Sequence, residues 1–170
     1  MKVILVGYMA SGKSVVARGL AQLLNLRFVD TDKWIEARSC KTIPEIFSED
    51  GEHAFREKEK ECLEFLIDQD NMVIATGGGM PCFNNSADLM IELGETVYLQ
   101  AGVQTLVSRL WDEKSGRPIV KNFHAKEDLH SFISKHLSER EEYYKKCKHI
   151  VPVDGKSVET IAEEIKCILL

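Results

Sequence analysis

A chain of 170 residues, with 44% hydrophobic and 29% charged residues, is long enough to bury one substantial core, so no disulfide or metal is needed for stability. The net charge of −5 argues against a surface that binds nucleic acid or anionic membrane non-specifically, because both favour a basic protein. The five cysteines form no C-x-x-C pair, and no apolar run reaches about 18 residues, so we expect a complete cytoplasmic protein with reduced thiols.

Short apolar runs alternate with amphipathic stretches along the chain, a pattern typical of a parallel sheet covered by helices. We predict strands at 2–6, 27–30, 72–75, 96–99 and 148–153. We predict helices at 13–24, 32–39, 43–49, 52–69, 103–112, 128–146 and 157–169. No linker or repeat interrupts the alternation, so we expect a single α/β domain over 1–170.

The first predicted strand is followed at once by Gly-Tyr-Met-Ala-Ser-Gly-Lys-Ser at 7–14, a G-x-x-x-x-G-K-S/T loop. Gly7 and Gly12 permit backbone conformations that side chains would obstruct. The N–H groups of such a loop and the positive end of the next helix surround a phosphate. Lys13 supplies a cation for the β- and γ-phosphates, and the Ser14 hydroxyl can bind Mg²⁺. We therefore expect the chain to bind a nucleoside triphosphate.

Two carboxylates, Asp30 and Asp32, follow the second predicted strand, at the end of the sheet where open α/β proteins bind ligands. One could hold a magnesium-bound water, because Mg²⁺ keeps much of its hydration shell. The other could contact a hydroxyl that attacks phosphorus. The same pattern is equally well explained by one of the two acting as an ordinary helix cap.

The next predicted helix is heavily charged, and Glu52, Arg56 and Glu59 share one of its faces. From spacing alone, a solvated row of ion pairs is the favoured interpretation. Arg117 and Arg140, taken singly, are likewise interpreted as surface residues.

Three consecutive glycines, Gly77, Gly78 and Gly79, follow the third predicted strand. Such a run lets a ligand approach the backbone closely and exposes N–H donors, whereas a plain turn would need one or two glycines. This favours a functional role.

Residues 113–127 are polar, contain Gly116 and Pro118, and show no clear period. A loop of this length is uncommon in a compact domain unless it has a function. We predict a mobile lid that keeps water from the γ-phosphate.

Taken together, these motifs resemble the shikimate kinase family. The loop at 7–14 is similar to the family's G-x-M-G-x-G-K-S/T. Further similar blocks are Phe-Val-Asp-Thr-Asp-Lys-Trp-Ile-Glu, Ile-Pro-Glu-Ile-Phe-Ser-Glu-Asp-Gly-Glu-His-Ala-Phe-Arg-Glu-Lys-Glu, the triple glycine, Gly-Arg-Pro-Ile-Val and Arg-Glu-Glu-Tyr-Tyr. They stand in the family's order over most of the chain, and the second is far more particular to the family than the phosphate-binding loop.

The resemblance implies transfer of the γ-phosphate of ATP to the 3-hydroxyl of shikimate, giving shikimate 3-phosphate and ADP, in the pathway to chorismate and the aromatic amino acids. It implies a three-layer α/β/α P-loop kinase fold similar to that of nucleoside-monophosphate kinases, with a five-stranded parallel sheet of order 2-3-1-4-5 and a mobile lid. We expect ATP as co-substrate, Mg²⁺ as cofactor, no nucleic-acid or membrane partner, and a monomer.

The resemblance also implies a role for individual residues. The catalytic residues would be Lys13, Asp32 and Arg117. ATP would be bound by Gly7, Ala10, Ser11, Gly12, Lys13, Ser14, Val15, Arg109 and Arg117, with Arg109 near the adenine. Shikimate would be bound by Asp32, Phe47, Arg56, Glu59, Gly77, Gly78, Gly79 and Arg140, with Arg56 and Arg140 on its carboxylate. The metal would be held by Ser14 and Asp30.

Two positions depart from the family pattern. Ala10 replaces the usual middle glycine of the loop, and we expect it to fit only if its backbone stays at negative φ. Val15 stands where threonine is frequent, which removes a hydroxyl near the phosphates. We expect tuned nucleotide affinity and intact activity. A gluconate or nucleoside-monophosphate kinase, and a nucleotide-binding module without catalysis, remain alternatives that an assay with and without shikimate separates.

Overall fold

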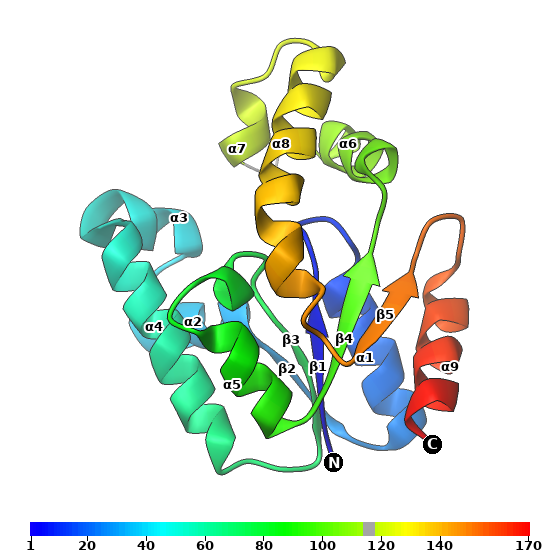
Figure 1. Ribbon diagram of the computed structural model, residues 1–170. Coiled ribbons are helices and arrows are strands. Elements are labelled where there is room, and N and C mark those ends of the chain that lie inside the picture. Colours follow the sequence, from blue (N-terminus) through cyan, green and yellow to red (C-terminus); the bar gives the residue numbers. More distant parts are fainter. Residues whose placement is uncertain (114–117) are drawn as a thin grey trace.

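The computed structural model, which describes residues 1–113 and 118–170, contains a five-stranded sheet with helices on both faces (Figure 1). The strands are β1 (Lys2–Val6), β2 (Arg27–Asp30), β3 (Met72–Ala75), β4 (Glu95–Gln100) and β5 (His149–Pro152). They are all parallel and lie in the order β2-β3-β1-β4-β5, which confirms the predicted topology. The central strand β1 is buried along its whole length, as expected where helices cover both faces of a parallel sheet.

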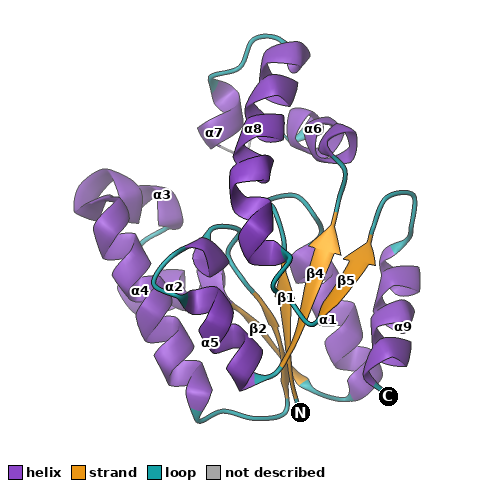
Figure 2. Cartoon of the chain, in the orientation of Figure 1, coloured by secondary structure: helices purple, strands orange, loops and turns teal. Residues whose placement is uncertain are grey.

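The helices form two layers and one projecting group (Figure 2). On one face lie α1 (Lys13–Leu24) and α9 (Val158–Leu169), which pack against each other. The other face carries α2 (Thr31–Ser39), α3 (Ile43–Glu45), the π-helix η1 (Ile46–Asp50), α4 (Gly51–Ile67), the 3₁₀-helix η2 (Met80–Cys82) and α5 (Ser86–Leu93). Beyond the carboxyl ends of the strands project α6 (Val103–Asp112), α7 (Pro118–Lys121) and α8 (Lys126–Tyr144).

Local sequence signals explain several element boundaries. Thr42 and Glu45 form the reciprocal hydrogen bonds of a capping box at the start of α3. Gly51 has φ of 84°, in the left-handed region, and lies at the boundary between η1 and α4. Ser157 caps α9 by accepting a hydrogen bond from the Thr160 N–H.

Three short helices were not predicted from the sequence: η2, α5 and α7. The eight-residue α5 buries only Ser86, Ala87 and Met90, which is too few positions to reveal a period, and its N-cap Asn85 provides no side-chain hydrogen bond. The four-residue α7 lies inside 113–127, which was predicted to be a loop. The predicted strands agree with the observed ones to within one residue at each end.

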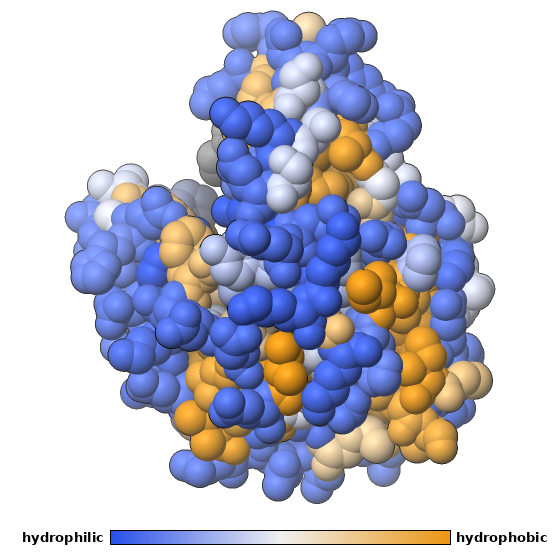
Figure 3. All heavy atoms as spheres, viewed as in Figure 1, coloured by the Kyte–Doolittle hydropathy of each residue, from blue (hydrophilic) through white to orange (hydrophobic). Residues whose placement is uncertain are grey.

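None of the helices in the described parts of the chain has the length and apolar content needed to cross a membrane. Hydrophilic side chains cover most of the face shown in Figure 3, which is visibly hollowed between the α3–α4 side and α8.

Candidate active site

The carboxyl ends of β1, β2 and β3 meet at a cavity of about 430 Å³. Its lining includes the loop from Met9 to Val16 together with residues that follow other strands. Of the predicted site residues, it brings together Ala10, Ser11, Gly12, Lys13, Ser14, Val15, Asp30, Asp32, Gly78 and Arg109. The cavity therefore lies where the topology of an open parallel sheet places a ligand site.

The loop after β1 is shaped by backbone conformations that side chains rarely allow. Gly7 has φ of 154°, and a Cβ there would lie 2.8 Å from the Leu99 carbonyl oxygen. Gly12 has φ of 95° at the N-cap of α1. The buried Lys13 ammonium group donates hydrogen bonds to the carbonyls of Gly7 and Tyr8, at 2.8 and 2.9 Å. Its cation is thus held over the loop, at the positive end of the α1 dipole.

The expectation for Ala10 is wrong, because its φ is 64°. Alanine therefore adopts a left-handed conformation here, at a cost of about 1–2 kcal/mol. The Ala10 carbonyl accepts a hydrogen bond of 3.0 Å from Arg109 Nη1, on α6. Because this bond fixes the peptide orientation after Ala10, Arg109 helps to hold the strained residue in place.

Val15 lies in the first turn of α1 and leaves 53% of its surface exposed beside the cavity. An apolar side chain there provides no hydrogen bond to a phosphate.

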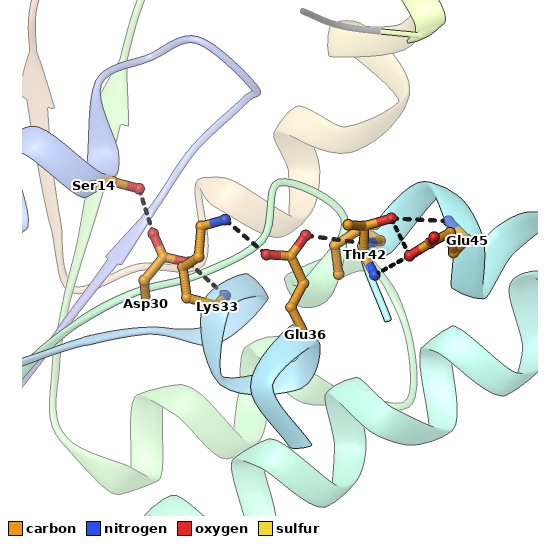
Figure 4. Close-up of polar contacts among 7 residues, drawn as sticks. Ser14, Asp30, Lys33, Glu36, Thr42 and Glu45 are labelled. Carbon is orange, nitrogen blue, oxygen red and sulfur yellow. Dashed lines mark hydrogen bonds and ion pairs between the residues drawn. The ribbon is translucent and has the colours of Figure 1, made fainter. Parts of the chain in front are cut away.

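Ser14 and Asp30 lie side by side, and the Ser14 hydroxyl donates a hydrogen bond of 2.6 Å to Asp30 Oδ2 (Figure 4). The other carboxylate oxygen of Asp30 accepts from the Lys33 N–H and caps α2. The two interpretations of this aspartate are therefore compatible. Figure 4 also shows the polar chain continuing through the ion pair of Lys33 with Glu36, which accepts from the Ile43 N–H near the Thr42–Glu45 capping box.

The Ser14 and Asp30 oxygens fit Mg²⁺, which prefers hard oxygen ligands and usually retains several waters. In the described ranges, no group of three or more His, Cys, Asp or Glu side chains could hold a metal. A site with few protein ligands suits a cation that shares its coordination with substrate phosphates.

Asp32 lies in the first turn of α2, close to this pair. Burial raises the pKa of its carboxyl group, and the charge of Asp30 raises it further, while Lys13 acts in the opposite direction. The carboxyl group is thus more basic than an exposed aspartate.

Arg56 and Glu59 form a buried ion pair on α4, in which Arg56 Nη1 lies 2.7 Å from Glu59 Oε2. Only 9% of Arg56 and 2% of Glu59 is exposed, so the interpretation as a solvated row of charges is wrong for both. It applies only to Glu52, whose side chain is 59% exposed and lies 3.1 Å from Arg56 Nη2. Burial raises the pKa of Glu59 to about 7 against the opposing effect of Arg56.

The three glycines after β3 each face a different polar group. A Cβ on Gly77 would lie 2.7 Å from Asp32 Oδ1 and 3.2 Å from Glu59 Oε1. A Cβ on Gly78 would lie 3.2 Å from the Met9 amide nitrogen. On Gly79 it would lie 2.8 Å from Arg56 Nη1. None of these three glycines has a left-handed φ, so close approach is the reason that glycine is needed.

Three buried polar atoms in this neighbourhood lack a hydrogen-bond partner among the described residues: Asp32 Oδ1, Arg56 Nε and Glu59 Oε1. An unsatisfied buried polar group costs about 1–3 kcal/mol, and such groups are rare in folded proteins. Two of the three flank Gly77, and the third belongs to the guanidinium group that faces Gly79. A polar ligand beside the triple glycine would satisfy them.

Helix α8 carries Arg140 to the same region. Burial raises the pKa of Tyr8, Tyr144 and Glu59, and the positive charge of Arg140 partly opposes this rise in all three. The Tyr144 hydroxyl donates a hydrogen bond of 2.6 Å to the Gly78 carbonyl. The Tyr8 hydroxyl lies 2.8 Å from His136 Nδ1.

Sequence reasoning missed these contacts of α8. A signal was present, because His136, Arg140 and Tyr144 follow one another at intervals of four residues and so share a helix face.

Several predicted site residues do not line the cavity: Gly7, Phe47, Arg56, Glu59, Gly77, Gly79 and Arg140. Phe47 is 38% exposed and packs on Phe55, with ring centroids 4.7 Å apart, and it is absent from the described lining. Arg117 lies outside the described residues. Arg56, Glu59, Gly77 and Gly79 lie beside the cavity, around the unpaired atoms.

Comparison with known proteins agrees with this geometry. The shikimate kinase family model matches residues 9–169. The chain is 42% identical to the shikimate kinase of Flavobacterium psychrophilum and 39% identical to that of Flavobacterium johnsoniae, in each case over 99% of this chain and 98% of the relative.

Solved structures of shikimate kinases are also similar. That from Bacteroides thetaiotaomicron has a TM-score of 0.92 at 34% identity, covering 99% of this chain and 98% of the other. That from Acinetobacter baumannii, in complex with shikimate, has a TM-score of 0.89 at 29% identity, covering 99% and 92%. By sequence and by structure, the chain belongs to the shikimate kinase family.

Proposed function

We propose that the cleft at the carboxyl ends of β1, β2 and β3 transfers the γ-phosphate of ATP to the 3-hydroxyl of shikimate, giving shikimate 3-phosphate and ADP. The phosphorylated product leads toward chorismate and the aromatic amino acids. The kinase activity is that of the family to which the chain belongs. The observation that carries the assignment of residues is the set of unpaired buried atoms of Asp32, Arg56 and Glu59 beside the phosphate-binding loop.

The loop 7–14 and the start of α1 bind the phosphates in this proposal. Backbone N–H groups and the α1 dipole attract them, and Lys13 compensates charge on the β- and γ-phosphoryl oxygens. Arg109, which lines the cavity, contacts the nucleotide near the adenine. Arg117, from the lid that we propose over 113–127, approaches the transferring phosphate.

Ser14 and Asp30 would hold Mg²⁺, which supplies positive charge to the phosphoryl oxygens when bound. Their contact at 2.6 Å supports this assignment, because it already places two hard oxygen donors together.

Arg56 and Arg140 anchor the shikimate carboxylate, whose planar geometry suits guanidinium groups. A Cβ on Gly79 would lie 2.8 and 3.0 Å from the two terminal nitrogens of Arg56 and 3.3 Å from Cζ. These distances put that position in front of the Nη1–Nη2 edge and close to the guanidinium plane. The absence of a side chain at Gly79 therefore lets this edge of Arg56 lie close to the backbone of the triple glycine.

Asp32 orients the 3-hydroxyl and accepts its proton. Burial raises the pKa of this carboxyl group, which favours proton acceptance by it. Transfer through a loose transition state needs mainly alignment and charge stabilisation, so anchoring the ring at its carboxylate is most of what the acceptor residues contribute. Glu59 holds Arg56, and the triple glycine lets these groups reach one another.

We further propose that the chain functions as a single domain over 1–170, as a cytoplasmic monomer without nucleic-acid or membrane partners. The acidic net charge supports the absence of such partners.

An ADP-release assay over a panel of acceptors tests this function. We expect turnover that depends on shikimate and is negligible with gluconate or nucleoside monophosphates. In Arg56→Lys, which keeps the charge but loses the planar fork, we expect the KM for shikimate to rise at least about tenfold while the KM for ATP stays within about twofold. Arg38→Ala, at an exposed position of α2, serves as the control. Turnover with gluconate in place of shikimate, or an unchanged shikimate KM in Arg56→Lys, would contradict the proposal.

A further inference from the structure

The turn that follows η2 contacts Arg56 twice, and the function proposed above assigns no role to it. Arg56 Cζ lies 3.8 Å from the ring centroid of Phe83, so the guanidinium group lies directly over the ring. Phe55, on α4 itself, is more remote, with its centroid 5.3 Å from the same atom. Phe83 is the aromatic residue in closest contact with this arginine among the described cation–ring pairs.

The neighbouring Asn84 contacts the main chain of the same residue. Its Nδ2 donates a hydrogen bond of 3.3 Å to the Arg56 carbonyl. Asn84 and Asn85 have φ of 54° and 56°, a left-handed conformation that asparagine tolerates better than most residues. These two residues turn the chain back toward α4 between η2 and α5. One turn thereby contacts both the side chain and the backbone of Arg56.

The ion pairs alone do not fix the plane of the Arg56 guanidinium group. Glu52 is 59% exposed, and such a partner constrains a side chain weakly. The buried partner is Glu59, which contacts Nη1 at 2.7 Å. A guanidinium group held firmly at one nitrogen can still pivot about that contact. A ring stacked on its face removes this freedom.

We propose that Phe83 is a positioning residue for acceptor binding, which stacks on Arg56 and holds the plane of its guanidinium group, beside Gly79, for contact with the acceptor. Bidentate binding of a carboxylate requires the two planar groups to be aligned. Loss of the ring therefore weakens binding of a carboxylated acceptor and leaves nucleotide binding unchanged. This inference rests on the proposed role of Arg56.

Steady-state kinetics on the full chain test the inference. In Phe83→Leu, which keeps an apolar side chain but loses the aromatic face, we expect the shikimate KM to rise about tenfold, with kcat and the ATP KM within about twofold. Phe83→Tyr keeps the ring, so its shikimate KM stays within about twofold. Phe83→Met replaces Phe83→Leu if the latter does not fold. Phe65→Leu, at an exposed ring elsewhere on α4, is the matched control and leaves all constants unchanged.

A double substitution separates positioning from a general structural effect. In the Arg56→Lys background no guanidinium plane remains to be aligned, so Phe83→Leu adds less than about twofold to the shikimate KM. A full tenfold effect in that background, or no effect of Phe83→Leu in the wild type, overturns the inference. An unchanged shikimate KM in Arg56→Lys alone contradicts instead the proposed role of Arg56, so the two failures are distinguishable.

Discussion

The two halves of the cleft are built in different ways. The phosphate-binding part of the nucleotide half comes from one continuous stretch, 7–16, in which main-chain groups and a helix end lie around the cavity. Asp30 and Arg109 line the same cavity from β2 and α6. The acceptor half is assembled from side chains on α2, α4 and α8 and the glycines after β3. Two of its charged residues, Arg56 and Glu59, are buried, and three of its polar atoms are unpaired in the described structure. Local backbone geometry thus suffices for a phosphate, whereas a small carboxylated ring needs groups that only the tertiary fold brings together.

The largest effect should come from removing the positive charge of Lys13 from the nucleotide half. In Lys13→Met, which keeps the length of the side chain, we expect kcat to fall about 100- to 1,000-fold because charge stabilisation of the transferring phosphoryl group is lost. The shikimate KM should change by less than about threefold. Steady-state kinetics measure both, with the exposed Lys135→Met as control. A fall in kcat of less than tenfold would remove Lys13 from the catalytic step.

A methyl group in the acceptor half should have the next largest effect. In Gly79→Ala the new Cβ lies 2.8 Å from Arg56 Nη1, so the guanidinium group must shift. We expect the shikimate KM to rise at least about tenfold with an ATP KM within about twofold. Gly19→Ala is the control, because its Cβ would meet only Val158 and Ala162, at 3.8 and 3.9 Å. Equal kinetic constants in the two variants would argue against the acceptor site.

The buried carboxyl group of Glu59 gives the acceptor half a pH-dependent stability. Its pKa is raised from 4.5 to about 7 in the folded protein, so the unfolded state releases this proton first. The favourable contribution of neutral Glu59 is therefore complete below pH 4.5 and is lost as pH rises through about 7. The loss is at most about 3 kcal/mol.

Thermal unfolding of the wild type and Glu59→Gln across this pH range measures the effect. The Tm of Glu59→Gln minus that of the wild type should increase between pH 4.5 and 7, because glutamine does not ionise. A difference that stays constant with pH would mean that Glu59 titrates normally.

The smallest effect should come from relieving strain in the nucleotide half. In Ala10→Gly the left-handed φ of 64° becomes easy to adopt, and this gain is partly offset by greater freedom of the unfolded chain. We expect stability between unchanged and about 1 kcal/mol higher in urea unfolding. Ala37→Gly, inside α2, should instead lose about 0.5–1 kcal/mol. Equal losses at the two positions would contradict the strained conformation of Ala10.

The difference between a local loop and a site assembled by the tertiary fold also explains what the sequence could predict. The glycine-lysine loop is a local signal that the sequence shows directly, and its nucleotide contacts stay a prediction. The order of the sheet followed from the family resemblance and is confirmed. The burial of Arg56 and Glu59 was not predicted, because helical spacing looks the same for a solvated and an enclosed row of charges. Only the packing of α4 against other elements distinguishes them.

The other features that the sequence did not predict have similar physical causes. The left-handed Ala10 is held by Arg109, which lies 99 residues away, so no local rule predicts its φ. Phe83 and Asn84 lie in a short irregular turn with no periodic pattern, and their contact with Arg56 depends on the tertiary fold.

The central claim is that the acceptor half recognises a carboxylate through Arg56, and methyl shikimate, which lacks that charge, tests it most directly. We predict that the wild type has a kcat/KM at least about 100-fold lower for the ester than for shikimate, and that Arg56→Lys reduces this ratio to less than about tenfold. Equal kcat/KM for the acid and the ester in the wild type would contradict the account.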